Sequence, residues 1–230
     1  MKSNGFRRER ELRRQESYQG HILHAAERVI LRKGYSALTM DDVAREARLS
    51  KATVYKYVAG KGALLLEILG HSFDHLRERL AAIADGPGTP SDRLGLLVEA
   101  VLRSGEDMSH FNRVLWMDKA MLKLMRVFVT APGKAGAATP ADRKLLAMVK
   151  HKRQEMIEVG ARVLEAGIAS GEFRSMDTRQ ASAFVEAVLQ GYMHLRVWQS
   201  DTPLSPAAAE GLTRFIIEGI RNPEASGKEI

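Results

Sequence analysis

The sequence predicts an all-α fold in which a small amino-terminal head precedes a larger helical body. Apolar residues recur at helical spacing along most of the 230 residues, and no stretch sustains the alternation typical of a strand. Residues 1 to 62 contain 14 Lys and Arg against 7 Asp and Glu, whereas the remaining residues contain 21 of each. The net charge of +7 therefore lies in the first quarter of the chain. This asymmetry favours a nucleic-acid-binding head on a neutral body.

Composition also limits the function classes. The chain contains no cysteine, which excludes disulfides, zinc fingers and thiol catalysis. The basic amino terminus lacks an apolar signal region, and no run approaches the ~20 apolar residues of a membrane span. We therefore expect a soluble, unexported, cytoplasmic protein without a membrane partner.

The first 16 residues are predicted to form a basic flexible arm. They include five arginines and are either a solvated tail or an arm that follows DNA phosphates or a minor groove. A helical pattern begins near Ser17 and ends at Gly34. Its apolar positions are Ile22, Ala25, Ala26, Val29 and Ile30.

Residues 39 to 57 predict two short helices joined by a tight turn. Thr39 can cap the first helix, and Asp41 and Asp42 place negative charge in its first turn. Ser50 can cap the second helix, which follows the turn at Arg48 and has few residues that need burial. With the preceding helix, they form a three-helix domain over residues 17–60 that contains a helix-turn-helix.

Many residues of this region follow one family pattern in register. They are Ile22, Leu23, Ala25, Ala26, Gly34, Tyr35, Thr39, Met40, Asp42, Val43, Ala44, Ala47, Ser50, Lys51, Thr53, Val54, Tyr55, Lys61, Leu64 and Leu65. This pattern resembles the DNA-binding head of TetR-family transcriptional regulators over roughly residues 17 to 66. The sequence departs from it at Arg48 and Ala52, where glycine is frequent, at Val58, where an aromatic residue is common, and at Gly62, where an acid is usual.

The resemblance implies that the second helix of the motif enters the DNA major groove. The candidates for base edges are Ala52, Thr53 and Lys56, because lysine suits guanine and the threonine methyl suits thymine. The candidates for phosphates are Thr39, Lys51, Tyr55, Tyr57 and Lys61. Each could instead be a solvated surface side chain, and either tyrosine could pack within the head.

The body is predicted to span residues 61–222, followed by a disordered tail at 223–230. A long helix runs from Lys61 to Ala84 and is stopped by the Gly-Pro-rich segment at 85–90. Further helices are indicated after residue 94, within 111–129, over 140–169 and in two carboxy-terminal segments. A flexible loop is predicted at 131–139.

The last two helices each carry small residues on an apolar face. The resemblance implies that they form a homodimer through a four-helix bundle, although they could also complete a monomeric core. The candidate interface residues are Ala183, Ala187, Gly191, Leu195, Leu212, Phe215 and Gly219. A two-fold dimer would read a near-palindromic operator with half-sites about 34 Å apart or a multiple of that distance.

The middle of the chain carries the candidate effector site. Eight of the ten methionines lie between residues 108 and 193, and their flexible thioethers suit adaptable apolar surfaces. The candidate effector residues are Trp116, Met117, Met121, Met125, Phe128, Tyr192 and Trp198. Glu99, Asp118, Glu186, His194 or Arg196 could hold one polar group of the ligand. Any one of these residues could also be ordinary core.

The function that follows is a ligand-responsive transcriptional regulator, a repressor released from its operator by a small apolar or aromatic effector. No cofactor, metal site or catalytic residue is expected, because no arrangement of nucleophile, base and acid or of metal ligands stands out. The alternatives are an architectural nucleic-acid binder without an effector, and a helical small-molecule-binding protein or enzyme.

Overall fold

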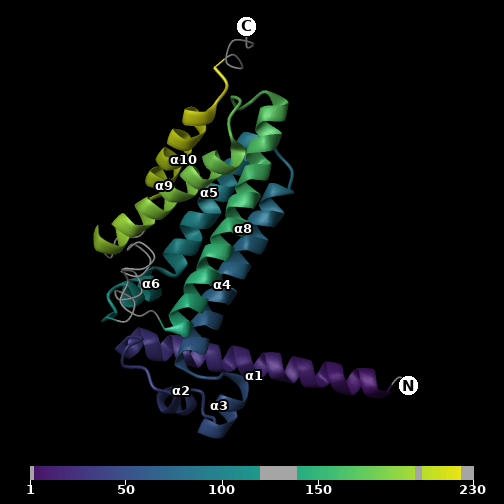
Figure 1. The fold of residues 1–230 in the computed structure, drawn as a ribbon. Coiled ribbons are helices and arrows are strands. Elements are labelled where there is room, and N and C mark those ends of the chain that lie inside the picture. Colours follow the sequence, from purple (N-terminus) through teal and green to yellow (C-terminus); the bar gives the residue numbers. More distant parts are fainter. Residues whose placement is uncertain (1–2, 120–138, 200–203, 224–230) are drawn as a thin grey trace. The chain divides into compact units, whose positions relative to one another are not determined.

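The computed structural model describes residues 3–119, 139–199 and 204–223 (Figure 1). Within these ranges the chain forms nine helices and no strand, and its extended residues pair in one isolated bridge between Phe173 and Arg221. The helices are α1 (Ser3–Lys33), α2 (Met40–Glu46), α3 (Lys51–Tyr57), α4 (Lys61–Ala84), α5 (Pro90–Asp107), α6 (Ser109–Trp116), α8 (Pro140–Ser170), α9 (Thr178–Gln199) and α10 (Pro206–Ile220). The predicted all-α fold is confirmed.

The chain divides into two compact units. The first comprises Met1–His71 and His110–Met148, and the second comprises Ser72–Ser109 and Val149–Ile230. Helices α4 and α8 each run through a boundary and contribute residues to both units. None of the helices in the described ranges combines the length and the apolar composition that a membrane span requires.

The core of the first unit begins with the buried face of α1. The predicted positions Ile22, Ala25, Ala26, Val29 and Ile30 are all fully buried, so the helical spacing identified them correctly. Helix α1 contacts both α2 and α3. These two helices contribute Val43, Ala44 and Val54 to the same core. The apolar face of α1 thus supports the helix-turn-helix.

Helix α1 extends further toward the amino terminus than the periodicity predicts. It begins at Ser3, whereas the sequence favours a flexible arm up to residue 16. Residues 7–16 consist of arginine, glutamate, glutamine and leucine, which all have high helix propensity. A propensity-driven helix needs no apolar face, which explains why the apolar pattern starts only near Ser17.

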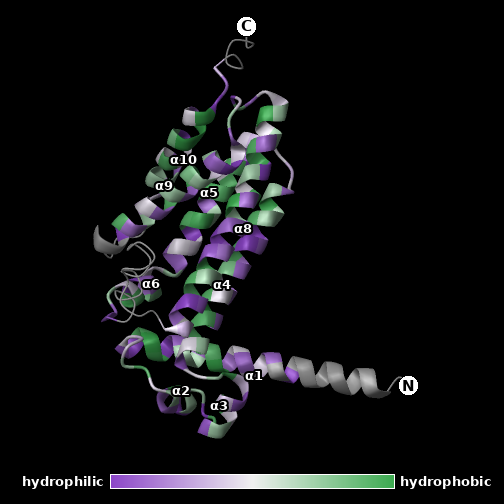
Figure 2. Ribbon diagram, in the orientation of Figure 1, coloured by the Kyte–Doolittle hydropathy of each residue, from purple (hydrophilic) through white to green (hydrophobic). Residues whose placement is uncertain are grey.

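The second unit is a helical bundle with its own apolar core. Its core includes Leu80, Leu102, Leu164 and Ile216 from the helices and Phe173 from the segment between α8 and α9. Hydrophobic and hydrophilic residues alternate along α4 and α8 in the manner of helices with one buried face (Figure 2). The predicted helix breaks are also present, because α4 ends at Ala84 and α8 ends before Gly171, whose φ is +80°.

Candidate nucleic-acid interface

Local capping determines where α2 begins. The backbone N–H of Asp42 donates to Thr39 Oγ1 at 3.2 Å, and the backbone N–H of Thr39 donates to the Asp42 carboxylate at 3.0 Å. This is a reciprocal capping box, which contains the Thr39 cap that the sequence predicts. The same carboxylate also accepts a hydrogen bond from the Thr39 hydroxyl. Thr39, a predicted phosphate contact, is therefore half of the cap that orients α2.

The turn between α2 and α3 contains a left-handed residue. Arg48 has a φ of +54°, and no other non-glycine residue in the described ranges has a positive φ. Its N–H donates to Arg45 O at 3.1 Å, and the Leu49 N–H donates to Ala44 O at 2.9 Å. This is the Schellman ending of a helix, in which glycine is the usual left-handed residue. The departure from the family pattern at Arg48 therefore puts a side chain in a backbone conformation that disfavours one.

Helix α3 is held by one cap and one buried side chain. The Thr53 N–H donates to Ser50 Oγ at 3.0 Å, and the Ser50 and Thr53 hydroxyl oxygens are 2.8 Å apart. Val54 is the buried residue of this helix. The predicted base contacts Ala52 and Lys56 are exposed, whereas Thr53 is half-buried. With its hydroxyl occupied by Ser50, Thr53 can offer its methyl group to a thymine.

The two tyrosines of α3 have different surroundings. The Tyr57 ring lies on the Tyr18 ring of α1, with centroids 5.3 Å apart and ring planes 3° apart. Lys56 Nζ is 5.7 Å from the Tyr57 ring centroid. Tyr55 is 47% exposed. The packing alternative weighed for the tyrosines thus describes Tyr57, while Tyr55 presents its ring to solvent.

The lysines at the starts of α3 and α4 also contact the head itself. Lys51 Nζ lies 3.0 Å from the Asp41 carboxylate, whose hydrogen bond raises the pKa of Lys51. Lys61 Nζ donates to Ser36 O at 2.8 Å and lies 4.4 Å from the Tyr35 ring centroid. Partial burial lowers the pKa of Lys61, against the opposing charge of Asp118. An ammonium group has three donors, so each lysine keeps donors for a phosphate.

Ion pairs fasten α1 to the acids of α2. Glu46 accepts from Arg28 at 2.8 Å and from Arg32 at 3.0 Å, and Lys33 bonds to Asp42. These hydrogen bonds hold the pKa values of both carboxyl groups below their usual range, with the Lys33 contact the largest cause for Asp42 and the Arg28 contact the largest for Glu46. The acids of α2 are thus engaged by α1.

Residues 22–68 match the family model described as bacterial regulatory proteins, tetR family. The matched segment contains the complete α2–turn–α3 motif, both caps and the start of α4. The head is therefore a TetR-family DNA-binding domain.

Curated relatives of the TetR-like head cover only part of the chain. The uncharacterized HTH-type transcriptional regulator YdeS of Bacillus subtilis is 41% identical over 54 residues, 24% of this chain and 27% of YdeS. The HTH-type transcriptional repressor KstR of Mycolicibacterium smegmatis is 29% identical over 126 residues, 54% of this chain and 57% of KstR. The chain thus matches 27% of the length of YdeS and 57% of the length of KstR.

The likeness extends through both units at the level of fold. A solved bacterial regulatory protein in the tetR family from Rhodococcus RHA1 is 23% identical and superposes with a TM-score of 0.64. The superposition covers 89% of this chain and 97% of that chain. The fold of TetR-family members is therefore present beyond the helix-turn-helix.

Helices α9 and α10 expose apolar side chains. Phe184, Val188, Leu195 and Phe215 are 62%, 38%, 48% and 67% exposed. Of the predicted interface residues, Ala187, Gly191, Leu195, Phe215 and Gly219 are exposed, whereas Ala183 and Leu212 are half-buried. On α9, residues 184, 188, 191 and 195 fall on one helical face. Exposed apolar side chains at this spacing are typical of a helix that packs against a partner.

The predicted effector residues are described only in part. Trp116 is half-buried and Met117 is 64% exposed, both in the first unit. Tyr192 packs against the core of the second unit. Met121, Met125 and Phe128 lie outside the described residues, as does the side chain of Trp198.

Most of the predicted polar partners of a ligand have partners within the protein. Glu99 accepts from Arg103 at 2.8 Å, and Glu186 accepts from Arg153 at 2.6 and 2.8 Å. Arg196 donates to Glu106 at 3.1 Å. Asp118 is buried and accepts hydrogen bonds from Ser36. These groups therefore serve the fold before any ligand binds.

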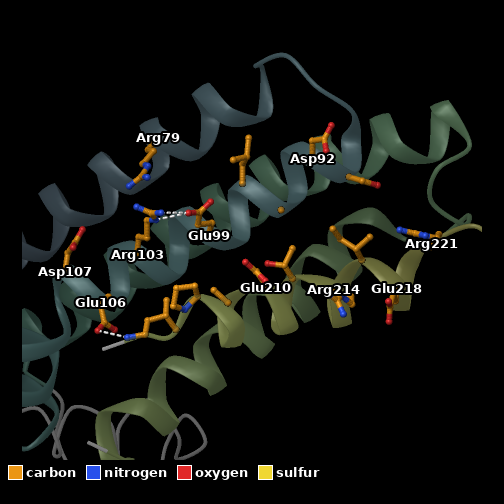
Figure 3. A pocket seen from close by; sticks show the side chains of 18 residues that line it. Arg79, Asp92, Glu99, Arg103, Glu106, Asp107, Glu210, Arg214, Glu218 and Arg221 are labelled. Atoms are coloured by element: carbon orange, nitrogen blue, oxygen red, sulfur yellow. Dashed lines mark hydrogen bonds and ion pairs between the residues drawn. The ribbon is translucent and has the colours of Figure 1, made fainter. Parts of the chain in front are cut away.

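Sequence reasoning missed an open groove between α5 and α10, which has a volume of about 1170 Å3. Figure 3 shows Glu99 and Arg103 on one wall and Glu210 on the other. Of the predicted aromatic and methionine effector residues, those whose side chains the structure describes, Trp116, Met117 and Tyr192, do not line this groove. Its walls come from helices far apart in the chain, so no local pattern could indicate it.

Proposed function

We propose that the chain is a ligand-responsive transcriptional repressor that binds double-stranded DNA as a homodimer. The observation that carries the proposal is the construction of α3. One cap and Val54 anchor this helix, while Ala52, Tyr55 and Lys56 remain exposed on it. Such a helix has a free polar surface that fits the major groove. The repressor assignment follows the name of the relative KstR.

Within this interface, Ala52, Thr53 and Lys56 contact base edges and so provide specificity. Thr39, Lys51, Tyr55, Tyr57 and Lys61 contact phosphates and so provide affinity and register. Lys56 and Arg48 are both exposed, which leaves both cations accessible to DNA. We place its site of action in the cytoplasm, where it would meet its DNA target.

The homodimer uses α9 and α10. The exposed Phe184, Val188, Leu195 and Phe215 supply the apolar surface, and Gly191 and Gly219 allow close approach of the partner helices. A Cβ atom built at either glycine meets nothing within 4 Å in a single chain. A two-fold dimer then reads a near-palindrome with half-sites about 34 Å apart or a multiple of that distance.

A small apolar or aromatic effector releases the operator. Its proposed contacts are Trp116, Met117, Met121, Met125, Phe128, Tyr192 and Trp198. Helix α4 is the proposed mechanical link, because it begins beside α3 at Lys61 and continues to Ala84 in the other unit. The effector must bind more tightly to the form whose heads do not match the groove spacing, since a ligand shifts an equilibrium only by its differential affinity.

Selection of bound sequences from a random DNA pool tests the proposal. We expect enrichment of one near-palindrome, followed by its release when apolar and aromatic compounds are added. Strong binding with steep salt dependence but no enriched sequence would instead indicate an architectural binder. No binding at low salt would contradict the DNA-binding function and favour a small-molecule-binding protein.

A further inference from the structure

The turn between α1 and α2 is held by two residues distant in the sequence. We define this head turn as residues 34–38. At its centre is Ser36, whose N–H donates to Asp118 Oδ2 at 2.6 Å and whose hydroxyl donates to Asp118 Oδ1. Its carbonyl oxygen accepts from Lys61 Nζ at 2.8 Å. Every polar atom of Ser36 is thus engaged by a residue outside the three-helix head.

The head turn is shaped to receive the Asp118 carboxylate. Gly34 has a φ of +81°, and a Cβ atom added there would lie 3.2 Å from Asp118 Oδ2. Because glycine has no Cβ atom, it adopts the left-handed backbone without strain and leaves room for the carboxylate. Asp118 itself is only 8% exposed. A buried carboxylate requires hydrogen-bond donors, and Ser36 supplies two of them.

The contact between Asp118 and Ser36 joins the end of α6 to the segment that leads into the helix-turn-helix. Asp118 follows the end of α6 by two residues and is adjacent to Met117, a proposed effector contact. Ser36 precedes the α2 cap, Thr39, by three residues. Because Asp118 is bonded directly to Ser36, a displacement at the end of α6 moves the head turn, which leads into α2.

We propose that Asp118 is a positioning residue for DNA binding, which holds the head turn to the end of α6 through Ser36. A ligand that displaces the end of α6 withdraws the carboxylate, frees the head turn and lowers operator affinity. This inference rests on the proposed function, because it assigns a residue to the coupling between the effector and the operator.

The test uses the operator obtained by random-pool selection and the full-length protein. Asp118→Ala removes both hydrogen bonds, and we expect about 10- to 100-fold weaker operator binding, the range for bonds to a charged group. Asp118→Asn preserves the geometry, because its amide oxygen can accept from the Ser36 N–H and its amide nitrogen can donate to Ser36 Oγ. We expect it to retain affinity within about threefold. Lys119→Ala, an exposed neighbour, is the matched control and should bind like the wild type.

Two further measurements separate positioning from simple support of the fold. Random-pool selection with Ser36→Ala should recover the same half-site sequence but tolerate more spacings between half-sites. In a double-mutant cycle, Ser36→Ala removes the hydroxyl donor to Asp118 but keeps the backbone N–H donor. Asp118→Ala should therefore weaken binding less in the Ser36→Ala background than in the wild type, so that the two effects are non-additive. Circular dichroism establishes whether each variant is folded.

The outcomes distinguish this inference from the proposed function. If the wild-type protein selects an operator but Asp118→Ala and Ser36→Ala bind it with wild-type affinity and spacing, the positioning role is wrong and the repressor function stands. If Asp118→Ala fails to fold, wild-type affinity and spacing for Ser36→Ala overturn the positioning role by themselves. If the wild-type protein selects no sequence, the proposed function fails, and the positioning role fails with it.

Discussion

The ring of Tyr57 at the end of α3 lies parallel to the ring of Tyr18 in α1, with centroids 5.3 Å apart. This stack links the recognition helix to the longest helix of the head across 39 residues of sequence. It adds an aromatic contact where Val54 is the buried anchor within α3. The orientation of α3 therefore depends on a residue that the helix-turn-helix pattern does not include.

Removal of this stack should weaken the head. Tyr57→Ala is expected to lower the free energy of unfolding by about 1 kcal/mol beyond its loss of buried area. Tyr57→Phe should keep most of the stability, because the ring remains. Urea denaturation of both variants and of Tyr18→Ala measures the effect. Equal stability of the Ala and Phe variants at position 57 would contradict a stabilising stack.

The left-handed conformation of Arg48 should make glycine favourable there. A side chain in this conformation costs about 1–2 kcal/mol, and glycine loses about 0.5–1 kcal/mol through its more flexible unfolded state. Arg48→Gly should therefore raise the free energy of unfolding by about 0.5 to 1 kcal/mol. Arg48→Ala is the control, since it removes the charge but keeps the Cβ atom. If Arg48→Ala raised the free energy of unfolding as much as Arg48→Gly, the effect would come from the lost charge and not from the backbone conformation.

Acidification should loosen α1 from α2. The pKa values of Asp42 and Glu46 are lowered in the folded protein, so the unfolded chain binds protons first as the pH falls. Their stabilising contribution is full above the unfolded pKa values of about 4 and is lost below them. Thermal denaturation between about pH 6 and pH 2 should show this loss. Glu46→Gln should have a flatter profile than the wild type, and an unchanged profile would count against the role of Glu46.

The exposed apolar face of α9 and α10 should be needed for dimers. Gly191→Asp places a charge in this face and should yield monomers with little operator affinity, because one head alone makes too few contacts. Gln190→Asp adds the same charge at an exposed residue that is rotated about 100° away on α9, and it should leave the dimer intact. Light scattering measures the masses. A dimer that survives Gly191→Asp places the interface elsewhere.

The two kinds of DNA contact should separate in binding assays. Lys56→Ala should weaken cognate binding and relax the preference at one base pair, typically by about 1–3 kcal/mol. Lys51→Ala and Lys61→Ala should weaken all sequences alike and reduce the salt slope by about one. Asp41→Asn is the control for Lys51, because it frees the ammonium group from its ion pair. Equal loss of discrimination from all three lysine variants would show that this division of roles is wrong.

Much of the head could be predicted from residues close together in sequence. The buried positions of α1, from Ile22 to Ile30, follow helical spacing, and Thr39 and Ser50 cap the helices that they precede. The start of α1 at Ser3 was not predicted, because a helix formed by propensity alone leaves no apolar pattern. The sequence raised but did not decide the question of the tyrosines, since exposure of Tyr55 and stacking of Tyr57 depend on which side of α3 faces α1.

By itself, the sequence determined the buried face of α1 and the caps of α2 and α3, because these depend on the periodicity of apolar residues and on local hydrogen bonds. Only the tertiary structure decided that Tyr18 meets Tyr57 and that Asp118 bonds to Ser36, 82 residues away. A short polar residue in a turn and an aspartate after a helix have many possible partners. Which partner each one finds depends on how the helices pack, since packing brings distant backbone and side-chain groups within hydrogen-bond distance.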